Sequence, residues 1–292
     1  MDTGVGVLAR RLERTGYLCD DQLATVLFLA LEMGRPLLLE GEPGTGKTAL
    51  AEAVAEALEL PLIRLQCYEG IDATQALYDW DFPRQILHLR AIEAVAGPGG
   101  ERDVGEAEKS LYDERFLLAR PVLAALQQSP AVLLVDEVDR ADDEFEAFLL
   151  EVLSTYQVTI PELGTVQAAV PPTVVLTSNR TRELHDALKR RCLYHWIDHP
   201  DLEREVAIVR SRAPEASQAL TRQVVEVVQR LRDRDDLLKP PGVAETIDWV
   251  RALERLGTTD LDLETAARTL GAVVKYREDA DRVRAALDRM LA

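Results

Sequence analysis

Hydrophobic positions follow two different patterns along this chain. Up to about residue 200, short continuous apolar runs alternate with segments in which apolar residues recur every three or four positions. This alternation predicts buried strands separated by amphipathic helices, whereas from residue 201 onward only the helical spacing remains. We therefore expect an α/β domain over residues 1–200, N-terminal helices included, and an all-helical domain over residues 201–292.

Within the α/β part, helices are predicted over residues 5–33 and 111–128. Strands are predicted from the apolar runs at residues 37–39, 62–67, 131–137 and 173–179 and from a short run after residue 191. Three segments depart from this alternation: an aromatic-rich insertion at residues 68–89, a loop at 97–110 and a β-hairpin at 157–170. In the insertion, Trp80 and Phe82 are candidates for contact with a partner protein. Alternatively, both side chains pack beneath the insertion.

The first predicted strand breaks into a glycine-rich turn and then into a helix, with the sequence PLLLEGEPGTGKTALAE. Glycine permits backbone conformations in which successive N–H groups turn inward around phosphate. Lys47 can reach the β- and γ-phosphates of a nucleotide, and the Thr48 hydroxyl can ligate Mg²⁺. We therefore predict a nucleotide site, and not a chance glycine-rich turn, at Gly41, Glu42, Pro43, Gly44, Thr45, Gly46, Lys47, Thr48 and Ala49.

Two carboxylates follow the buried run AVLLV, at the expected carboxyl edge of a parallel sheet where ligands bind in open α/β folds. Asp136 is predicted to hold Mg²⁺ through water, and Glu137 to polarise the attacking water as general base. The alternative is a pair of acids in a solvated turn. The upstream phosphate loop favours the catalytic interpretation.

Asn179 ends the next predicted strand, where a side-chain amide can hydrogen-bond both the γ-phosphate and the attacking water. It can equally be a turn residue that caps the following helix. Arg190 and Arg191 stand at a helix end just before the last strand. Basic residues there either stabilise the helix dipole or act on a nucleotide, and the order of the motifs favours action on a nucleotide.

Net charge and cysteine content restrict the remaining possibilities. A formal charge of −17 argues against a large nonspecific contact with DNA or anionic lipid, although a local basic patch is compatible with it. The three separated cysteines, with no secretory segment near the first residue, indicate reduced thiols in a cytoplasm. The longest apolar run falls well short of the about 20 residues that cross a bilayer. A zinc site at Cys192, His195 and His199 has a known spacing, but positions 192 and 195 point to opposite faces of a strand.

In this order, GEPGTGKT, VLLVDE, LTSN and KRRC, followed by an all-helical domain, resemble the AAA+ ATPases over nearly the whole chain. The insertion and the hairpin look like the helix-2 insert and the pre-sensor-1 hairpin of one AAA+ branch. Within that branch, EGxPGTGKT and the DExDRA pattern at residues 136–141 are similar to the MoxR ATPases. The segments GYLCDDQLATVLFLAL, YDWDFPRQ, FEAFLLEVL and RRCLYHWID look like the CoxD-type subgroup.

This resemblance implies a five-stranded parallel sheet, a helical lid, and a hexameric ring with ATP and Mg²⁺ at the subunit interfaces. It further implies a chaperone-like ATPase that matures a metalloenzyme, with a von Willebrand factor A domain protein as partner and a carbon monoxide dehydrogenase-like client. In this family Lys47 and Thr48 correspond to Walker A, Asp136 and Glu137 to Walker B, and Asn179 to sensor 1. Arg191 corresponds to the arginine finger, with Arg190 as its rival.

The chain departs from the family pattern at one place. The lid of this branch usually offers a sensor 2 arginine at a helix start, where this chain has Val243. Arg251, two turns later, is a possible substitute. This departure keeps a second function open, a nucleotide-controlled binding module with little turnover, beside a remodelling ATPase and a DNA-acting AAA+ protein.

Overall fold

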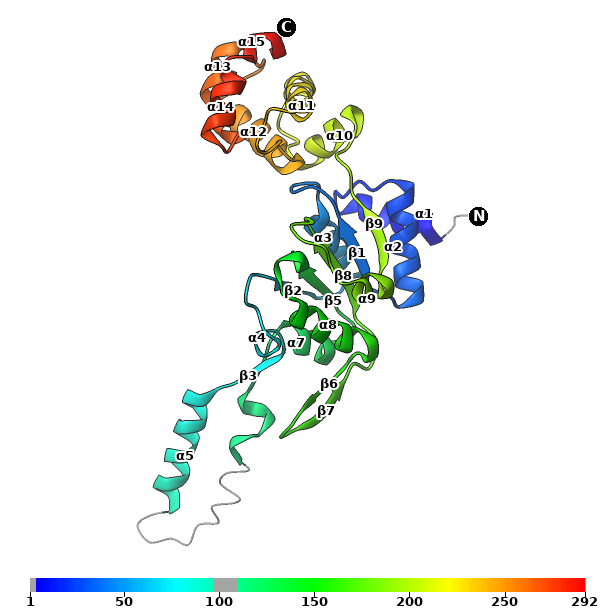
Figure 1. Ribbon diagram of the computed structural model, residues 1–292, viewed down its shortest axis with the longest axis vertical. Helices are drawn as coiled ribbons and strands as arrows, with labels where there is room; N and C mark the ends of the chain where they lie inside the picture. Colours follow the sequence, from blue (N-terminus) through cyan, green and yellow to red (C-terminus); the bar gives the residue numbers. More distant parts are fainter. Residues whose placement is uncertain (1–3, 97–109, 292) are drawn as a thin grey trace. The chain divides into compact units, whose positions relative to one another are not determined.

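A computed structural model describes residues 4–96 and 110–291 of the chain (Figure 1). Within these residues the main sheet has five strands, in the order β2-β5-β8-β1-β9. The strands are β1 Leu37–Glu40, β2 Leu62–Gln66, β5 Val132–Asp136, β8 Thr173–Ser178 and β9 Leu193–Trp196. Each lies where an apolar run predicted a strand, so the predicted α/β class is confirmed.

The central strands pair in parallel, which brings their carboxyl ends to one edge of the sheet. β5 pairs with β2 on one side, with Gln66 opposite Asp136, and with β8 on the other. Every residue of β5 is buried, as is characteristic of parallel strands that helices cover on both faces. Glu137 and Asn179 follow the last residues of β5 and β8, so both lie at this edge.

Helices flank the sheet (Figure 1). They are α1 Gly4–Arg14, α2 Asp21–Met33, α3 Lys47–Leu58, α7 Pro121–Gln127, α8 Asp143–Thr155 and α9 Asp186–Arg191. Asp142 precedes α8 as its N-cap, and its side chain accepts the N–H of Phe145. Phe145 and Leu149 then pack into the core beneath the sheet.

One acid of α8 does not face solvent. Glu146 is 1% exposed, and its carboxylate pairs with Arg182 and accepts the N–H of His185 at 2.8 Å. A buried carboxylate is stable when its oxygens receive such charged and neutral donors. Glu146 therefore ties α8 to the segment that follows β8.

The helix predicted over residues 111–128 is wrong in its first half. Residues Glu114–Phe116 form a 3₁₀ turn, and β4 Leu117–Ala119 pairs antiparallel with β3 Tyr78–Trp80. The helix α7 begins only at Pro121. Proline favours the first helical position and holds the residue before it extended, and Arg120 has φ −86° and ψ 171°.

The predicted insertion covers α4 Ala73–Leu77, β3 and the first half of α5 Phe82–Ala96. Trp80 lies half-buried between two rings, in edge-to-face contact with Tyr78 at 6.2 Å and Tyr112 at 5.3 Å between centroids. Phe82, in contrast, is 61% exposed. The packing interpretation therefore fits Trp80, and Phe82 stays a candidate contact residue. The loop predicted at residues 97–110 lies almost wholly outside the described residues.

The predicted hairpin is confirmed. β6 Gln157–Ile160 pairs antiparallel with β7 Gly164–Gln167, and Ile160 lies opposite Gly164 at the turn. On β6, Val158 and Ile160 are buried while Gln157 and Thr159 are exposed. One face of the hairpin therefore packs on the core and the other faces solvent.

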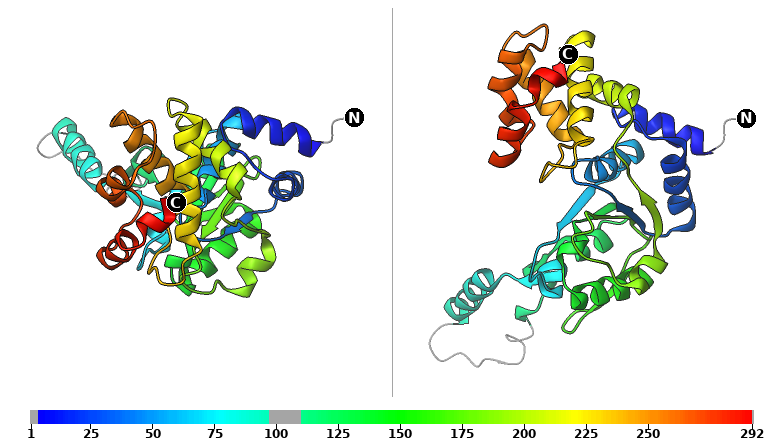
Figure 2. Two further views of the ribbon diagram at one scale, coloured as in Figure 1. Left: turned by 90° about the horizontal axis from the view of Figure 1, so that it is seen from above. Right: turned by 45° about the horizontal axis from the view of Figure 1, so that its top comes forward.

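The C-terminal helical region consists of helices that pack on one another around a core of their own (Figure 2). They are α10 Leu202–Arg212, α11 Gln218–Arg232, α12 Val243–Arg255, α13 Leu263–Thr269, α14 Arg277–Arg284 and α15 Leu287–Leu291. Trp249 is fully buried in this core, and its indole N–H donates to the Thr269 hydroxyl at 2.8 Å. No helix among the described residues is long and apolar enough to cross a membrane.

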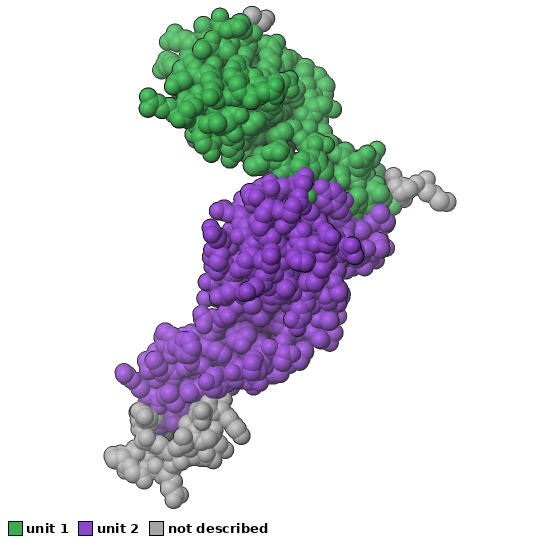
Figure 3. Space-filling model, in the orientation of Figure 1, with its two compact units in different colours: residues 1–28, 39–57, 195–292 green, residues 29–38, 58–194 purple. Residues whose placement is uncertain are grey.

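The chain divides into two compact units that do not follow a single cut in the sequence (Figure 3). One unit contains Met1–Phe28, Leu39–Ala57 and His195–Ala292, and the other contains Leu29–Leu38 and Leu58–Tyr194. The phosphate loop thus belongs to the same unit as the C-terminal helical region. A domain boundary at residue 200 stays a prediction.

Candidate functional site

The phosphate loop connects the buried strand β1 to helix α3. Gly44 and Gly46 have φ of +79° and +96°, conformations that a side chain would strain. The Lys47 ammonium lies inside the loop and donates to the carbonyls of Gly41 and Glu42 at 2.8 and 2.7 Å. Thr45 closes the turn by donating its hydroxyl to the Glu42 carbonyl at 2.9 Å.

This loop fits a polyphosphate. Lys47 is 6% exposed, so its charge acts where little water screens it. Thr48 lies in the first turn of α3, at the positive end of the helix dipole. The predicted residues Gly41, Glu42, Pro43, Gly44, Thr45, Gly46, Lys47, Thr48 and Ala49 thus form one continuous loop and helix start.

In the other compact unit, the end of β5 holds a buried carboxylate between two donors. Asp136 is 3% exposed. Its Oδ1 accepts the Thr177 hydroxyl at 2.5 Å, and its Oδ2 accepts a guanidinium N–H of Arg64 at 2.6 Å. Thr177 comes from β8 and Arg64 from β2, the two strands that flank β5. Neighbouring strands therefore fix the orientation of this carboxylate.

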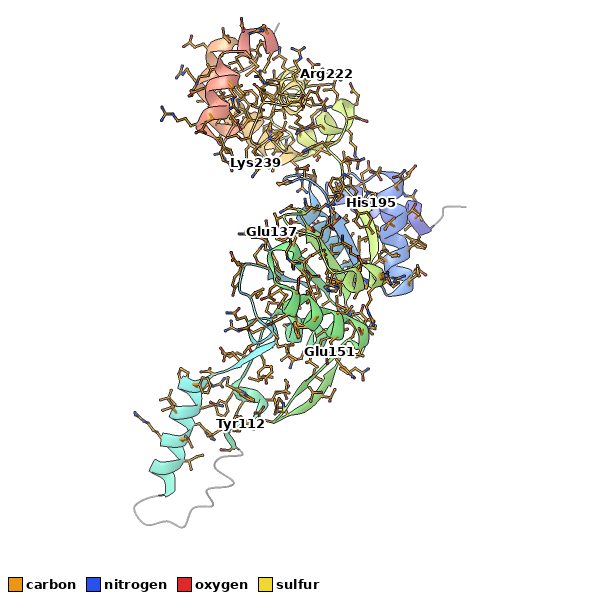
Figure 4. All side chains as sticks on the ribbon, in the orientation of Figure 1. Tyr112, Glu137, Glu151, His195, Arg222 and Lys239 are labelled. Carbon is orange, nitrogen blue, oxygen red and sulfur yellow. The ribbon has the colours of Figure 1, made fainter. Side chains whose placement is uncertain are left out.

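Glu137, labelled in Figure 4, takes a left-handed backbone conformation with φ 55° and ψ 49°. Such a conformation is uncommon for a residue with a side chain and is concentrated at functional sites. Its N–H donates to the Thr177 hydroxyl at 2.9 Å. Its carboxylate accepts from Gln66 at 3.1 Å, Arg140 at 3.2 Å and Asn179 at 3.4 Å.

The structure therefore brings together three of the residues predicted for the sheet edge. Glu137 and Asn179 are joined directly by a hydrogen bond, and Thr177 bridges Asp136 and Glu137. A pocket of about 1070 Å³ opens beside them and is lined by Glu137, Asn179, Arg140, Arg182 and several acids. A carboxylate and an amide at the wall of an open pocket are placed to hold a water molecule.

The basic end of α9 is held by a residue that sequence reasoning did not find. Arg35 donates to the carbonyls of Arg190 at 2.7 Å and of Arg191 at 3.0 Å. It thereby satisfies the last carbonyls of α9, which have no partner within the helix. The side chains of Arg190 and Arg191 are exposed, and the geometry offers no reason to prefer one over the other.

Sequence reasoning also missed Arg64, Gln66 and Thr177. Each lies at or near the carboxyl end of a strand next to β5, so strand pairing would have pointed to all three. The suggested substitute for a lid arginine is placed elsewhere. Arg251 donates to the Arg212 carbonyl at the end of α10, at 2.7 Å.

Cysteines and histidines do not form a metal centre among residues 4–96 and 110–291. Cys192 donates its thiol to the Leu188 carbonyl, and burial raises its pKa to about 12. Burial and nearby acidic side chains likewise raise the pKa of Cys67 to about 12. Both thiols are thus protonated near neutral pH and poor nucleophiles.

Comparisons with known proteins agree with this architecture. The chain is 26% identical over 283 residues to the gas vesicle ATPase GvpN of Haloferax mediterranei, covering 92% of this chain and 78% of that protein. It is 24% identical over 274 residues to the gas vesicle ATPase GvpN1 of Halobacterium salinarum, covering 89% and 76%. Its fold is similar to that of a Thermotoga maritima RuvB variant, with a TM-score of 0.52, 17% identity, and coverage of 92% and 74%.

The family model for the AAA domain of the dynein-related subfamily matches residues 36–192. This range begins just before β1 and ends just after α9. It therefore includes the phosphate loop, Asp136, Glu137, Asn179 and both arginines of α9. Because the match covers more than half of the 292 residues, the chain belongs to the AAA domain family, dynein-related subfamily.

Proposed function

We propose that this chain hydrolyses ATP with Mg²⁺ and uses the cycle to remodel a partner protein. Membership of the AAA domain family implies ATPase activity. The observation that carries the proposal is the Glu137 carboxylate, which meets the Asn179 amide at the wall of a pocket at the carboxyl edge of the sheet. A general base and a water-positioning amide are the two groups that hydrolysis of a phosphoanhydride needs there.

The role of each residue follows from its chemistry. Lys47 binds the β- and γ-phosphates, and its position inside the loop supports this role. Thr48 and Asp136 supply oxygen ligands of the kind that Mg²⁺ takes together with phosphates, and Mg²⁺ when bound neutralises charge that develops on them. Glu137 accepts the proton of the attacking water, and Asn179 orients that water. Arg191, with Arg190 as rival, acts on the γ-phosphate of a neighbouring subunit.

We assign the chain to the MoxR-type ATPases, and within them to the CoxD-type subgroup. The phosphate-loop and DExDRA sequences support the first assignment, together with the hairpin β6–β7 and the insertion after β2. The likeness to the gas vesicle ATPases supports the ATPase activity on which this assignment depends. In this proposal the chain assembles with copies of itself into a hexameric ring. Its partners are a von Willebrand factor A domain protein and a metalloenzyme client resembling carbon monoxide dehydrogenase.

We place the client contact on the insertion and on the hairpin. Helix α5 presents Phe82, Ile86 and Leu87 to solvent, with exposed fractions of 61%, 52% and 65%. Large apolar side chains exposed together on one helix are typical of a protein-binding surface. None of these residues belongs to the phosphate loop or to the sheet edge, so contact there leaves nucleotide chemistry intact.

A nucleotide-controlled binding module with little turnover is the competing function. Val243 at the expected sensor 2 position favours it, whereas the Glu137 and Asn179 geometry favours turnover. A DNA-acting role is disfavoured by the charge of −17. Phosphate release therefore separates the two main candidates.

The test is steady-state phosphate release by the purified protein, with and without candidate partners. Lys47→Ala should abolish ATP binding, because the ammonium holds the phosphates. Glu137→Gln should bind ATP and lose about 10²- to 10⁴-fold in turnover, the usual contribution of a general base. Glu151→Gln, the same change at an exposed position of α8, should match the unaltered protein. Equal loss of ATP affinity in the first two variants would contradict these roles.

A further inference from the structure

The first turn of α12 lies directly against the phosphate loop, within one compact unit. The N–H of Val243 donates to the carbonyl of Gly44 at 3.0 Å. Val243 is the first residue of α12, so its N–H has no acceptor inside the helix. We call the four residues Pro43, Gly44, Gly242 and Val243 the loop–helix junction.

Close backbone approach at this junction requires glycine on both sides. A Cβ placed on Gly242 would lie 2.8 Å from both the Gly44 Cα and the Pro43 carbonyl oxygen. A Cβ on Gly44 would lie 3.0 Å from the Gly242 Cα, and its φ of +79° already favours glycine. Gly242 itself has φ −86° and ψ 179°, which any residue adopts, so the requirement at 242 is one of space.

Buried side chains hold the segment that leads into this helix. Arg232, at the end of α11, donates its Nε to the Pro241 carbonyl at 2.7 Å. Its other two nitrogens form a bidentate pair with Glu205 of α10, at 2.6 and 2.8 Å. The fully buried Asp279 accepts the N–H groups of Leu238 and of Lys239, the latter labelled in Figure 4. The helical region thus presents a fixed helix start to the loop.

The hydrogen bond from Val243 to the Gly44 carbonyl responds to binding of phosphates in the loop. An arginine that contacts the γ-phosphate responds instead to the presence of that one phosphate. The N–H groups of a phosphate loop cradle the α- and β-phosphates, so a nucleoside diphosphate is enough to occupy the loop. Phosphates bound there also hold the backbone of Gly44, to whose carbonyl Val243 donates. Because coupling between two sites is reciprocal, a helix start held on this carbonyl also raises nucleotide affinity.

We propose that the C-terminal helical region senses occupancy of the phosphate loop through the loop–helix junction, and so responds to ADP as it does to ATP. The junction lies at the helix start where the family resemblance predicts a sensor 2 arginine and this chain has Val243. This inference rests on the proposed nucleotide binding, but it does not require hydrolysis.

The sharpest test removes a single N–H. Val243→Pro deletes the donor to Gly44, while proline is well accepted at the first position of a helix. The extended Gly242 also suits a residue before proline. Val243→Ala is the matched control, because it shortens the side chain and keeps the N–H. In titrations with a fluorescent ADP analogue, Val243→Pro should bind about 5-fold or more weakly than Val243→Ala.

A second pair of variants tests the junction by added volume. Gly242→Ala places a methyl group against Gly44 and Pro43 and should weaken ADP binding in the same way. Gly271→Ala adds the same methyl group in the same helical region where nothing lies within 4 Å, and should bind ADP normally. Circular dichroism on all four proteins establishes that they are folded. If Val243→Pro does not fold, the Gly242 and Gly271 pair carries the test.

Hydrogen exchange of α11 and α12 then measures the response itself. ADP and ATP should protect these helices to the same extent in the unaltered protein and in Val243→Ala, and neither should in Val243→Pro. Protection with ATP alone, or ADP affinity in Val243→Pro equal to that of its control, would overturn the proposal. Absence of phosphate release in the unaltered protein would sink the proposed ATPase and leave the junction standing. Absence of ADP binding would sink both.

Discussion

Arg232 and Glu205 form a buried salt bridge in the C-terminal helical region. Variants of this pair should show separate effects on the free energy of unfolding and on the affinity for ADP. Glu205 is fully buried and Arg232 is 9% exposed, so water cannot replace a missing partner. In Arg232→Ala the Glu205 carboxylate keeps only the Thr246 hydroxyl at 2.8 Å and the Gln229 amide at 3.3 Å. Breaking a buried pair from one side costs about 3–5 kcal/mol, and we expect that loss here.

An exposed pair between the same two helices provides the control. Arg222 of α11, labelled in Figure 4, contacts Glu203 of α10 at 2.8 Å, with side chains 37% and 73% exposed. Arg222→Ala should cost about 0–1 kcal/mol, because solvent screens such pairs. The measurement is urea unfolding followed by fluorescence of Trp249, which is buried in the same core, after Trp80 and Trp196 are replaced by phenylalanine.

A double variant distinguishes the buried charge from the positioning of the junction. Glu205→Leu with Arg232→Met removes both charges and should recover most of the lost stability, as apolar replacements of buried pairs often do. Arg232→Ala and the double variant both remove the Arg232 donor to the Pro241 carbonyl, so both should bind ADP more weakly than the unaltered protein. A loss in Arg232→Ala no larger than that in Arg222→Ala would refute the reasoning about burial. Full recovery of ADP affinity in the double variant would refute the positioning role.

Three further predictions concern the sheet edge, the finger and the insertion. Arg191→Ala should bind ATP yet be inactive, and mixing it with Glu137→Gln should restore some phosphate release; no rescue in co-assembled rings points to Arg190 or to action within one subunit. Arg64→Ala should lower the Mg²⁺ concentration needed for half-maximal hydrolysis, because it removes a cation that competes with Mg²⁺ for Asp136. The change should be up to about 5-fold, since Arg64 in this ion pair is half exposed. An unchanged Mg²⁺ concentration for half-maximal hydrolysis would refute the competition. Phe82→Ala should spare basal hydrolysis and weaken partner binding in a pull-down; full binding removes Phe82 from the contact.

Local patterns were enough to predict the parts of the site that depend on strand ends and turns. The phosphate loop needs glycines and a lysine at fixed spacing, and the position of Asp136 after a buried run follows from the geometry of a parallel sheet. The same reasoning placed Asn179 at the end of β8, next to β5. Such features are readable because each depends on residues that are close in sequence.

Contacts between distant segments were not predictable in the same way. Arg64 meets Asp136 across 72 positions of sequence, and Arg35 meets the end of α9 across 155. Glu146 has the spacing of a solvent-facing acid, and donors from the distant Arg182 and His185 make its burial tolerable. The helix predicted across residues 114–120 failed because strand pairing with β3 outweighed a weak helical period.

Val243 shows why the contact between the C-terminal helical region and the phosphate loop was the hardest feature to predict from the sequence. The sequence has Val243 where the family resemblance predicts an arginine, but the contact found there uses an N–H and a carbonyl, which nearly every residue carries. A main-chain contact can be recognised in a sequence only where it leaves no space for a side chain and so requires glycine. Here that residue is Gly242. In the run KPPGVAE this glycine reads as part of a helix stop, because Pro240 and Pro241 precede it. Gly242 faces the backbone of Gly44 at a distance that excludes a methyl group, and for that reason we assign it to the nucleotide site and not to the linker.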